Sequence, residues 1–210
     1  MNKINKHTSS NLDKYNCTNS FAVKRIANFY DNIIKLVSHV KHSNILSVGC
    51  GECFDVQSIL DSSKIKYEYC CGFDLNLDSL KMARKTMTHL RLDVINGDID
   101  HLPFKLNKFD IIFCLEVLEH LTNPDNVLKE IHHNFNGYCV FSVPNEPLYR
   151  LTRAFIYRLN IKELGNHPEH LNNWSKRKFS RLIKKYFEID QIIASFPWTI
   201  VLCHSKDMKK

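Results

Sequence analysis

Apolar residues recur along this chain with two alternating periods. Between residues 21 and 40 they repeat at helical spacing, which predicts an amphipathic helix. Beyond it, short apolar runs typical of buried strands alternate with segments of helical period. The strands are expected at 45–48, 67–73, 90–95, 109–115 and 138–143, and the helices between them at 54–60, 79–87 and 124–134. This alternation predicts an α/β fold, with parallel strands joined by right-handed crossovers and helices on both faces.

The last third of the chain breaks this alternation. Residues 144–175 lack a strand pattern and carry Asn, Pro, His and aromatic residues, so we expect a lid inserted after strand five. A basic helix and two closing apolar segments follow at 176–186, 187–194 and 198–203. Residues 1–20 are polar and are expected to form a mobile N-terminal segment, which leaves 21–210 as a single domain.

Composition narrows the classes of protein that this sequence can encode. The apolar runs are far shorter than the roughly 20 residues of a membrane span, and residues 1–24 are too polar for a signal peptide. We therefore expect a cytoplasmic protein with no membrane partner, whose eight cysteines are reduced thiols. Cys50 and Cys53 form a lone C-x-x-C pair, for which a metal or redox role is the less favoured alternative. The net charge of +7 favours a solvated basic face over a polyanion site.

A glycine turn follows the strand at 45–48. Gly49 and Gly51 let the backbone turn tightly and approach a ligand. The next strand ends at Asp74, about 20 residues downstream, where a carboxylate can accept hydrogen bonds from both hydroxyls of a ribose. A dinucleotide site shares these features, but its pyrophosphate motif expects a third glycine in the neighbourhood of Cys53. The turn therefore suits the uncharged or cationic part of a sulfonium cofactor better than a phosphate.

The segments VGCGE, GFDL, NGDIDHLPF, FDIIFCLEVLEHL and SVPNEP resemble the class I S-adenosylmethionine-dependent methyltransferases, in the branch similar to the ubiquinone-pathway O-methyltransferases. The resemblance implies a Rossmann-like, seven-stranded, mostly parallel sheet with S-adenosylmethionine as the cofactor. The implied cofactor site consists of Gly49, Cys50, Gly51, Asp74, Leu75, Asp98, Ile99, Leu115 and Glu116. In it the glycines lie beside the methionine moiety, Asp74 holds the ribose and Asp98 the adenine amino group. The chain departs from the family at Ser47, where Asp or Glu is frequent.

Acidic and imidazole groups are concentrated after the fourth strand. A chain that turns helical after Leu115 would place Glu116, Glu119 and His120 on one face, as a divalent-metal site or as an acid–base set. The alternative is that Glu119 and His120 cap the loop while Glu116 shapes the cofactor pocket. With His170, in HPEHLNNWS, the chain also weakly resembles the small-RNA 2′-O-methyltransferases. That resemblance implies Glu116, Glu119, His120 and His170 as metal ligands; our catalytic candidates are His120, Glu116 and His170.

The methyl acceptor is indicated only by residue types outside the sheet. Aromatic and basic groups there are typical of a wall for a planar or anionic acceptor. They are Tyr15, Tyr149, Arg150, Arg153, Tyr157, His167 and Trp174. The favoured function is methyl transfer to an oxygen of a small molecule. The alternatives are an RNA 2′-O-methyltransferase whose basic helix binds phosphates, and a nucleotide-binding domain without catalysis.

Overall fold

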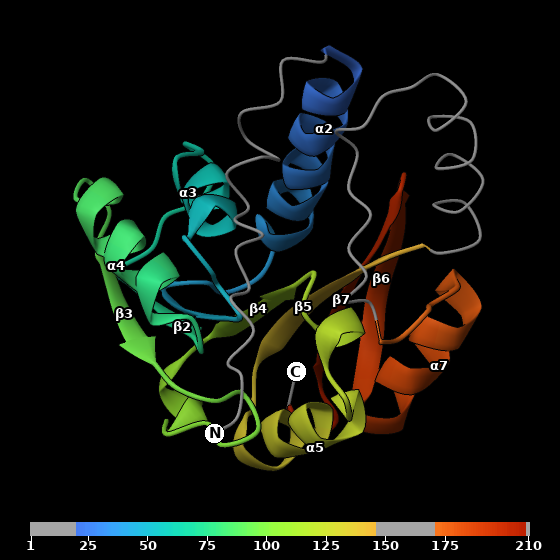
Figure 1. Ribbon diagram of the computed structural model, residues 1–210. Coiled ribbons are helices and arrows are strands. Elements are labelled where there is room, and N and C mark those ends of the chain that lie inside the picture. Colours follow the sequence, from blue (N-terminus) through green and yellow to red (C-terminus); the bar gives the residue numbers. More distant parts are fainter. Residues whose placement is uncertain (1–19, 146–170, 209–210) are drawn as a thin grey trace, which may run out of the picture.

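A seven-stranded sheet organises the chain in the computed structural model, which describes residues 20–145 and 171–208 (Figure 1). The strands are β1 (Asn44–Val48), β2 (Tyr69–Asp74), β3 (Leu92–Asn96), β4 (Ile111–Leu115), β5 (Tyr138–Pro144), β6 (Phe187–Ser195) and β7 (Trp198–Ser205). They lie in the order β3-β2-β1-β4-β5-β7-β6. All neighbours are parallel except β7, which runs antiparallel to both β5 and β6. The predicted seven-stranded, mostly parallel sheet is confirmed.

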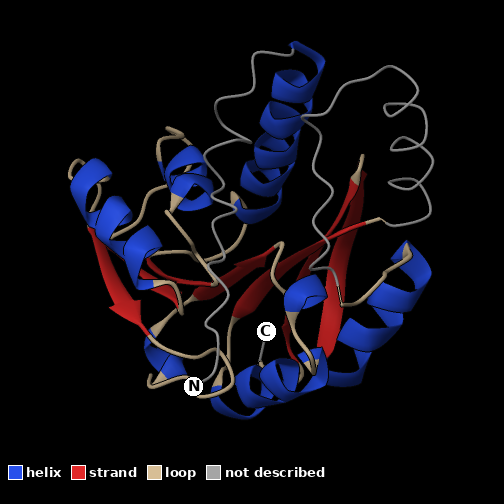
Figure 2. Cartoon of the chain, in the orientation of Figure 1, coloured by secondary structure: helices blue, strands red, loops and turns tan. Residues whose placement is uncertain are grey.

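Helices cover both faces of the sheet (Figure 2). They are α2 (Ser20–Val37), α3 (Phe54–Leu60), α4 (Leu77–Thr86), α5 (Pro124–Asn134) and α7 (Lys176–Tyr186), with the 3-10 turns η1 (Leu106–Lys108) and η2 (Leu118–His120). The first three helices pack on one face, and α5 and α7 on the other (Figure 1). Among the described residues, no helix is both long and apolar enough to cross a membrane.

The sequence pattern predicts the boundaries of the helices and strands to within three residues. The helices expected at 54–60, 124–134 and 176–186 begin and end at those residues. Helix α4 begins at Leu77, earlier than expected, because the Asn76 side chain accepts hydrogen bonds from the N–H groups of Asp78 and Ser79. Residues 1–19 of the expected mobile segment and residues 146–170 of the expected lid lie outside the described residues.

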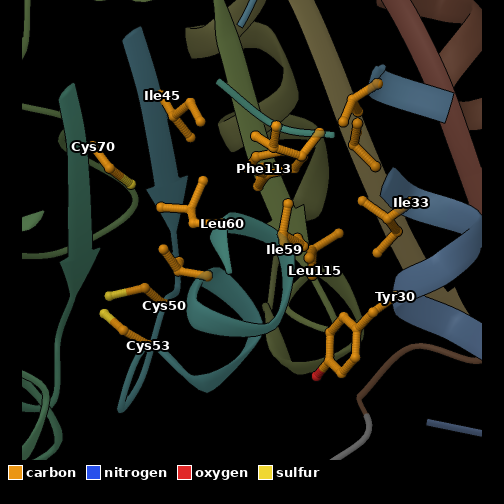
Figure 3. Close-up of a cluster of buried hydrophobic side chains, with 14 of the residues drawn as sticks. Tyr30, Ile33, Ile45, Cys50, Cys53, Ile59, Leu60, Cys70, Phe113 and Leu115 are labelled. Carbon is orange, nitrogen blue, oxygen red and sulfur yellow. The ribbon is translucent and has the colours of Figure 1, made fainter. Parts of the chain in front are cut away.

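Two hydrophobic clusters fix the sheet between its helices. In the first, Figure 3 shows Ile33 of α2, Ile59 of α3 and Phe113 of β4 meeting on one face. In the second, α5 and α7 bury apolar side chains such as Leu128 and Phe179 against the opposite face. Because β1 to β4 are parallel, their carboxyl ends open at one edge of the sheet, which is where ligands bind in folds of this class.

Candidate active site

The turn after β1 brings bare backbone against two neighbouring strands. Gly49 has φ +71° and Gly51 has φ +50°, in the left-handed region that side chains rarely adopt. The N–H of Gly49 donates to the carbonyl oxygen of Phe73 in β2 at 2.7 Å. A Cβ built on Gly49 would lie 2.4 Å from Cγ2 of Val117. Both conformation and space therefore require glycine at position 49.

Two carboxylates connect this turn to the start of α4. Asp74, the last residue of β2, accepts hydrogen bonds from the N–H groups of Gly51 and Asn76, each at 2.7 Å. Glu52 is only 4% exposed and accepts from Oγ of Ser79 at 3.1 Å. The sequence pattern indicates Asp74 as a site residue, which stays a prediction, whereas nothing in the sequence distinguishes the buried Glu52 from an exposed turn residue.

The other predicted cofactor residues differ in how accessible their side chains are. Asp98, after β3, is exposed, and Ile99 packs against the second hydrophobic cluster. Leu75 is 70% exposed, whereas Leu115 and Cys50 are 6% and 4% exposed. The side chains of Leu115 and Cys50 belong to the first hydrophobic cluster. A cofactor could therefore meet these two residues only through their backbone.

The described cysteines have the environment of structural thiols. All seven are free and buried. The hydrogen bond with Cys53 and burial raise the pKa of the Cys50 thiol, and burial raises the pKa of Cys71 to about 11. Such thiols stay protonated near neutral pH, where thiolates are needed for metal binding and exchange. The Cys50 and Cys53 sulfurs fill the space beside Gly72, at 2.8 and 3.0 Å from a Cβ built there.

The chain after β4 does not form the expected α-helix. Glu116 adopts φ +56°, which interrupts any helical path, and η2 then makes one 3-10 turn. As a result Glu119 is 1% exposed, while His120 is exposed. Within residues 20–145 and 171–208 no three His, Cys, Asp or Glu side chains are placed to hold a metal ion. His170 lies outside those ranges, so the four-ligand set stays a prediction.

The segment that follows His170 lies against η2. The N–H groups of Leu171 and Asn172 donate to the carbonyl oxygen of Glu119 at 2.9 and 3.1 Å. Nδ2 of Asn172 donates to the carbonyl oxygen of Leu121 at 2.6 Å. These bonds hold the chain just after His170 at the edge where β4 ends.

The predicted acceptor wall is largely outside the described residues, which exclude Tyr15, Tyr149, Arg150, Arg153, Tyr157 and His167. Trp174 is described and half-buried. Its ring centroid lies 6.1 Å from that of Phe179, and it packs on the second hydrophobic cluster. The contact with Phe179 indicates that the Trp174 ring anchors the segment before α7. Contact between Trp174 and the methyl acceptor stays a prediction.

Comparisons with known proteins agree with this geometry. The family model described as a methyltransferase domain matches residues 46–136. The chain is 28% identical to the ubiquinone biosynthesis O-methyltransferase of Hydrogenovibrio crunogenus, over 92% of this chain and 94% of that protein. It is 30% identical to the tRNA U34 carboxymethyltransferase of Nautilia profundicola, over 50% of this chain and 35% of that protein. It also covers 66% of the ubiquinone biosynthesis O-methyltransferase of Coxiella burnetii, at 25% identity.

Solved structures share the fold at low sequence identity. The small RNA methyltransferase HEN1 matches with a TM-score of 0.71 and 17% identity, over 87% of this chain and 25% of that one. A putative methyltransferase in complex with the Haloferax volcanii Trm112 activator matches with a TM-score of 0.70 and 12% identity, over 95% of both chains. A methyltransferase domain therefore occupies residues 46–136, and the relatives support a class I S-adenosylmethionine-dependent methyltransferase. The class I pattern covers the glycine turn, Asp74 and the segment after β4.

Proposed function

We propose that this chain transfers a methyl group from S-adenosylmethionine to an oxygen of a small-molecule acceptor. The observation that carries the proposal is the bare backbone of Gly49 and Gly51 beside the carboxylate of Asp74. A turn of bare backbone at the carboxyl end of β1, next to a carboxylate placed for a ribose, fits this cofactor. The Hydrogenovibrio relative, an O-methyltransferase by name that matches over most of both chains, supports an oxygen acceptor.

In this mechanism the chain mainly aligns the two reactants. When bound, the cofactor would supply a methyl group activated by its sulfonium, so that an acceptor oxygen could bond to the methyl carbon in line as the sulfur leaves as a neutral thioether. Asp74 would accept hydrogen bonds from the ribose hydroxyls, and Asp98 from the adenine amino group. A hydroxyl that receives the methyl group must also lose its proton. Glu116, His120 and His170 are the proposed bases that remove this proton. The exposed His120 stands at the edge where β4 ends.

We propose that residues 144–175 form a lid over the acceptor. Support comes from its two described ends. The N–H of Asn145 donates to the carbonyl oxygen of Pro197 at 2.8 Å, and Asn172 is bound to η2. A segment held at this edge can exclude water from the reaction. Tyr149, Arg150 and His167 would then contact the acceptor.

A methyl-transfer assay with isotope-labelled S-adenosylmethionine tests the proposed function. We expect the purified chain to label the small-molecule fraction of an extract from its source, with no label released by ribonuclease. His120→Ala should lower the rate on the order of 100-fold, the usual contribution of a positioned proton acceptor. Lys81→Ala, an exposed change on α4, is the matched control and should keep the rate. Label that appears only in RNA would contradict the small-molecule proposal.

A second function, methylation of RNA, is favoured by the charge of α7. A hollow on this helix is lined by Lys176, Arg177, Ser180, Arg181 and Lys184. Lys185 pairs with Asp125, but Arg177, Arg181 and Lys184 have no acidic partner in the part of the chain that the structure describes. The helix begins directly after the segment bound to η2, so a phosphate backbone along it would lead to the active-site edge. In this function a divalent ion on Glu116, Glu119, His120 and His170 would fix the acceptor hydroxyls.

The triple variant Arg177→Glu, Arg181→Glu, Lys184→Glu tests this second function. If RNA lies along α7, removing three phosphate contacts should flatten the slope of log affinity against log salt by about two, since each contact to a single strand contributes about 0.7. Fluorescence anisotropy with a labelled single-stranded RNA, at several salt concentrations, measures that slope. Cofactor affinity should not change, because the three side chains project from the outer face of α7.

A charge-matched variant with Lys64, Lys66 and Lys85 changed to Glu is the control, since these exposed lysines lie away from α7. It should keep the wild-type salt slope. Equal weakening in both variants would indicate a non-specific effect of net charge. Absence of RNA binding by the wild-type chain would reject the second function.

A further inference from the structure

Glu116 lies beside the glycine turn, although it comes from a different strand. In the pairing of β1 with β4, Ser47 is opposite Phe113. Continuing that register brings the residue after β4 to the level of the turn. The contact between Gly49 and Val117 shows this closeness directly, because a Cβ on Gly49 would lie 2.4 Å from Val117. The backbone of Glu116 therefore lies at the same part of the edge as the turn, and its half-buried side chain leaves the chain there.

A buried serine holds Glu116 in its left-handed conformation. Ser142, on β5, is 0% exposed within an otherwise apolar strand. Its hydroxyl accepts from the N–H of Glu116 at 3.1 Å and donates to Oε1 of Glu116 at 2.8 Å. A buried hydroxyl is unfavourable unless it is hydrogen-bonded, and Ser142 uses both of its functions on one residue. The bonds to Glu116 therefore explain why a serine stands in this apolar strand.

The cofactor of the proposed function has a charge that this turn must neutralise. Its methionine part is a zwitterion, whose ammonium group requires an acceptor when it is withdrawn from water. The nearby Ser47 is neutral and 5% exposed. Glu52 is 4% exposed and bound to Ser79, and Asp74 is bound to backbone N–H groups and assigned to the ribose. Asp55, in the first turn of α3, is bound to the hydroxyl of Tyr30. Glu116 is the carboxylate that the end of β4 brings to the level of the turn.

We propose that Glu116 binds the α-ammonium group of the cofactor and that Ser142 is the positioning residue for its carboxylate. The inference rests on the proposed cofactor. It deepens the proposed function by assigning cofactor recognition and proton removal to different residues. Glu116 then serves cofactor recognition, and removal of the acceptor proton falls to His120 and His170. The left-handed φ of Glu116 is explained as well, since it fixes where the side chain leaves the end of β4.

Calorimetric titration with two cofactor fragments tests this assignment. S-adenosylhomocysteine carries the ammonium group, and 5′-methylthioadenosine lacks the whole amino-acid part. Glu116→Gln should weaken S-adenosylhomocysteine by about 10- to 100-fold, the effect of losing a charged hydrogen bond, and leave 5′-methylthioadenosine unchanged. The buffer contains EDTA, so that no divalent ion on Glu116 contributes.

Variants of Ser142 test its positioning role. The quantity compared is the ratio of the affinity for S-adenosylhomocysteine to the affinity for 5′-methylthioadenosine. Ser142→Ala should weaken S-adenosylhomocysteine about 3- to 10-fold without affecting 5′-methylthioadenosine. Ser142→Thr retains the hydroxyl and should restore the ratio; should threonine not fold there, Ser142→Cys, a weaker donor, should give an intermediate value. Ser205→Ala removes another buried hydroxyl, 1% exposed on β7, and should leave the ratio unchanged.

The outcomes separate this inference from the proposed function. If the wild-type chain binds neither fragment, the cofactor assignment itself is wrong. If it binds both and Glu116→Gln weakens them equally or not at all, the cofactor assignment stands and the ammonium role of Glu116 is rejected. If Glu116→Gln acts as expected but Ser142→Ala leaves the ratio at the wild-type value, the positioning role of Ser142 is rejected.

Discussion

Alanine at position 49 is expected to abolish measurable binding of S-adenosylhomocysteine and to lower the free energy of unfolding by about 2–4 kcal/mol. Two effects add at this residue. The backbone has φ +71°, where any L side chain is strained, and the new Cβ would lie 2.4 Å from Cγ2 and 3.0 Å from Cγ1 of Val117. Relief of either effect moves the turn, and with it the backbone proposed to cradle the cofactor. Urea denaturation and calorimetric titration measure the two losses.

The double variant Gly49→Ala, Val117→Ala is the control for the clash. It removes both Cγ atoms and leaves Cβ of Val117 at 3.3 Å, a tight but tolerable contact. We expect part of the stability to return, while the strain from φ remains. A double variant as unstable as the two single variants added together would show that Val117 does not limit the space at Gly49.

The fold was predictable because its signals are local and agree with one another. Each parallel strand is a short apolar run, and each helix between two strands has one apolar face, so periodicity alone places β1, α3 and α5. The early start of α4 arises from a side-chain cap. The bonds of Asn76 start the helix two residues before the expected position 79, and a hydrophobic pattern does not record such a bond.

The site was predictable only where backbone chemistry dictates the residue type. Gly49 and Gly51 are required by positive φ, and sequence reasoning found them. Cys53 and Glu116 have φ +62° and +56° without being glycine, so their left-handed conformation has no sequence signal, and an α-helix was expected after Leu115. Tertiary contacts hold these residues, and the bonds between Ser142 and Glu116 span 26 positions along the chain.

Alanine at position 74 is expected to remove the rise in melting temperature that S-adenosylhomocysteine gives the wild-type chain. A ligand that binds only the native state stabilises it by mass action, and loss of two charge-assisted hydrogen bonds should weaken binding by at least about 100-fold. The Asp74 carboxylate also accepts from the N–H groups of Gly51 and Asn76. The variant will therefore melt earlier without ligand, and the informative quantity is the ligand-induced shift relative to its own baseline. Differential scanning fluorimetry over a range of ligand concentrations measures it.

Two comparisons separate a ribose contact from a general loss of structure. Asp74→Asn keeps one carbonyl oxygen for the turn and should retain more of the baseline stability, yet it should still lose most of the ligand-induced shift because the charge is gone. Asp78→Ala removes a carboxylate on the same helix start whose side chain is 90% exposed and paired with Lys81, and it should keep the full shift. If NAD stabilises the wild-type chain and S-adenosylhomocysteine does not, the carboxylate at the end of β2 serves a dinucleotide, and the cofactor assignment is wrong.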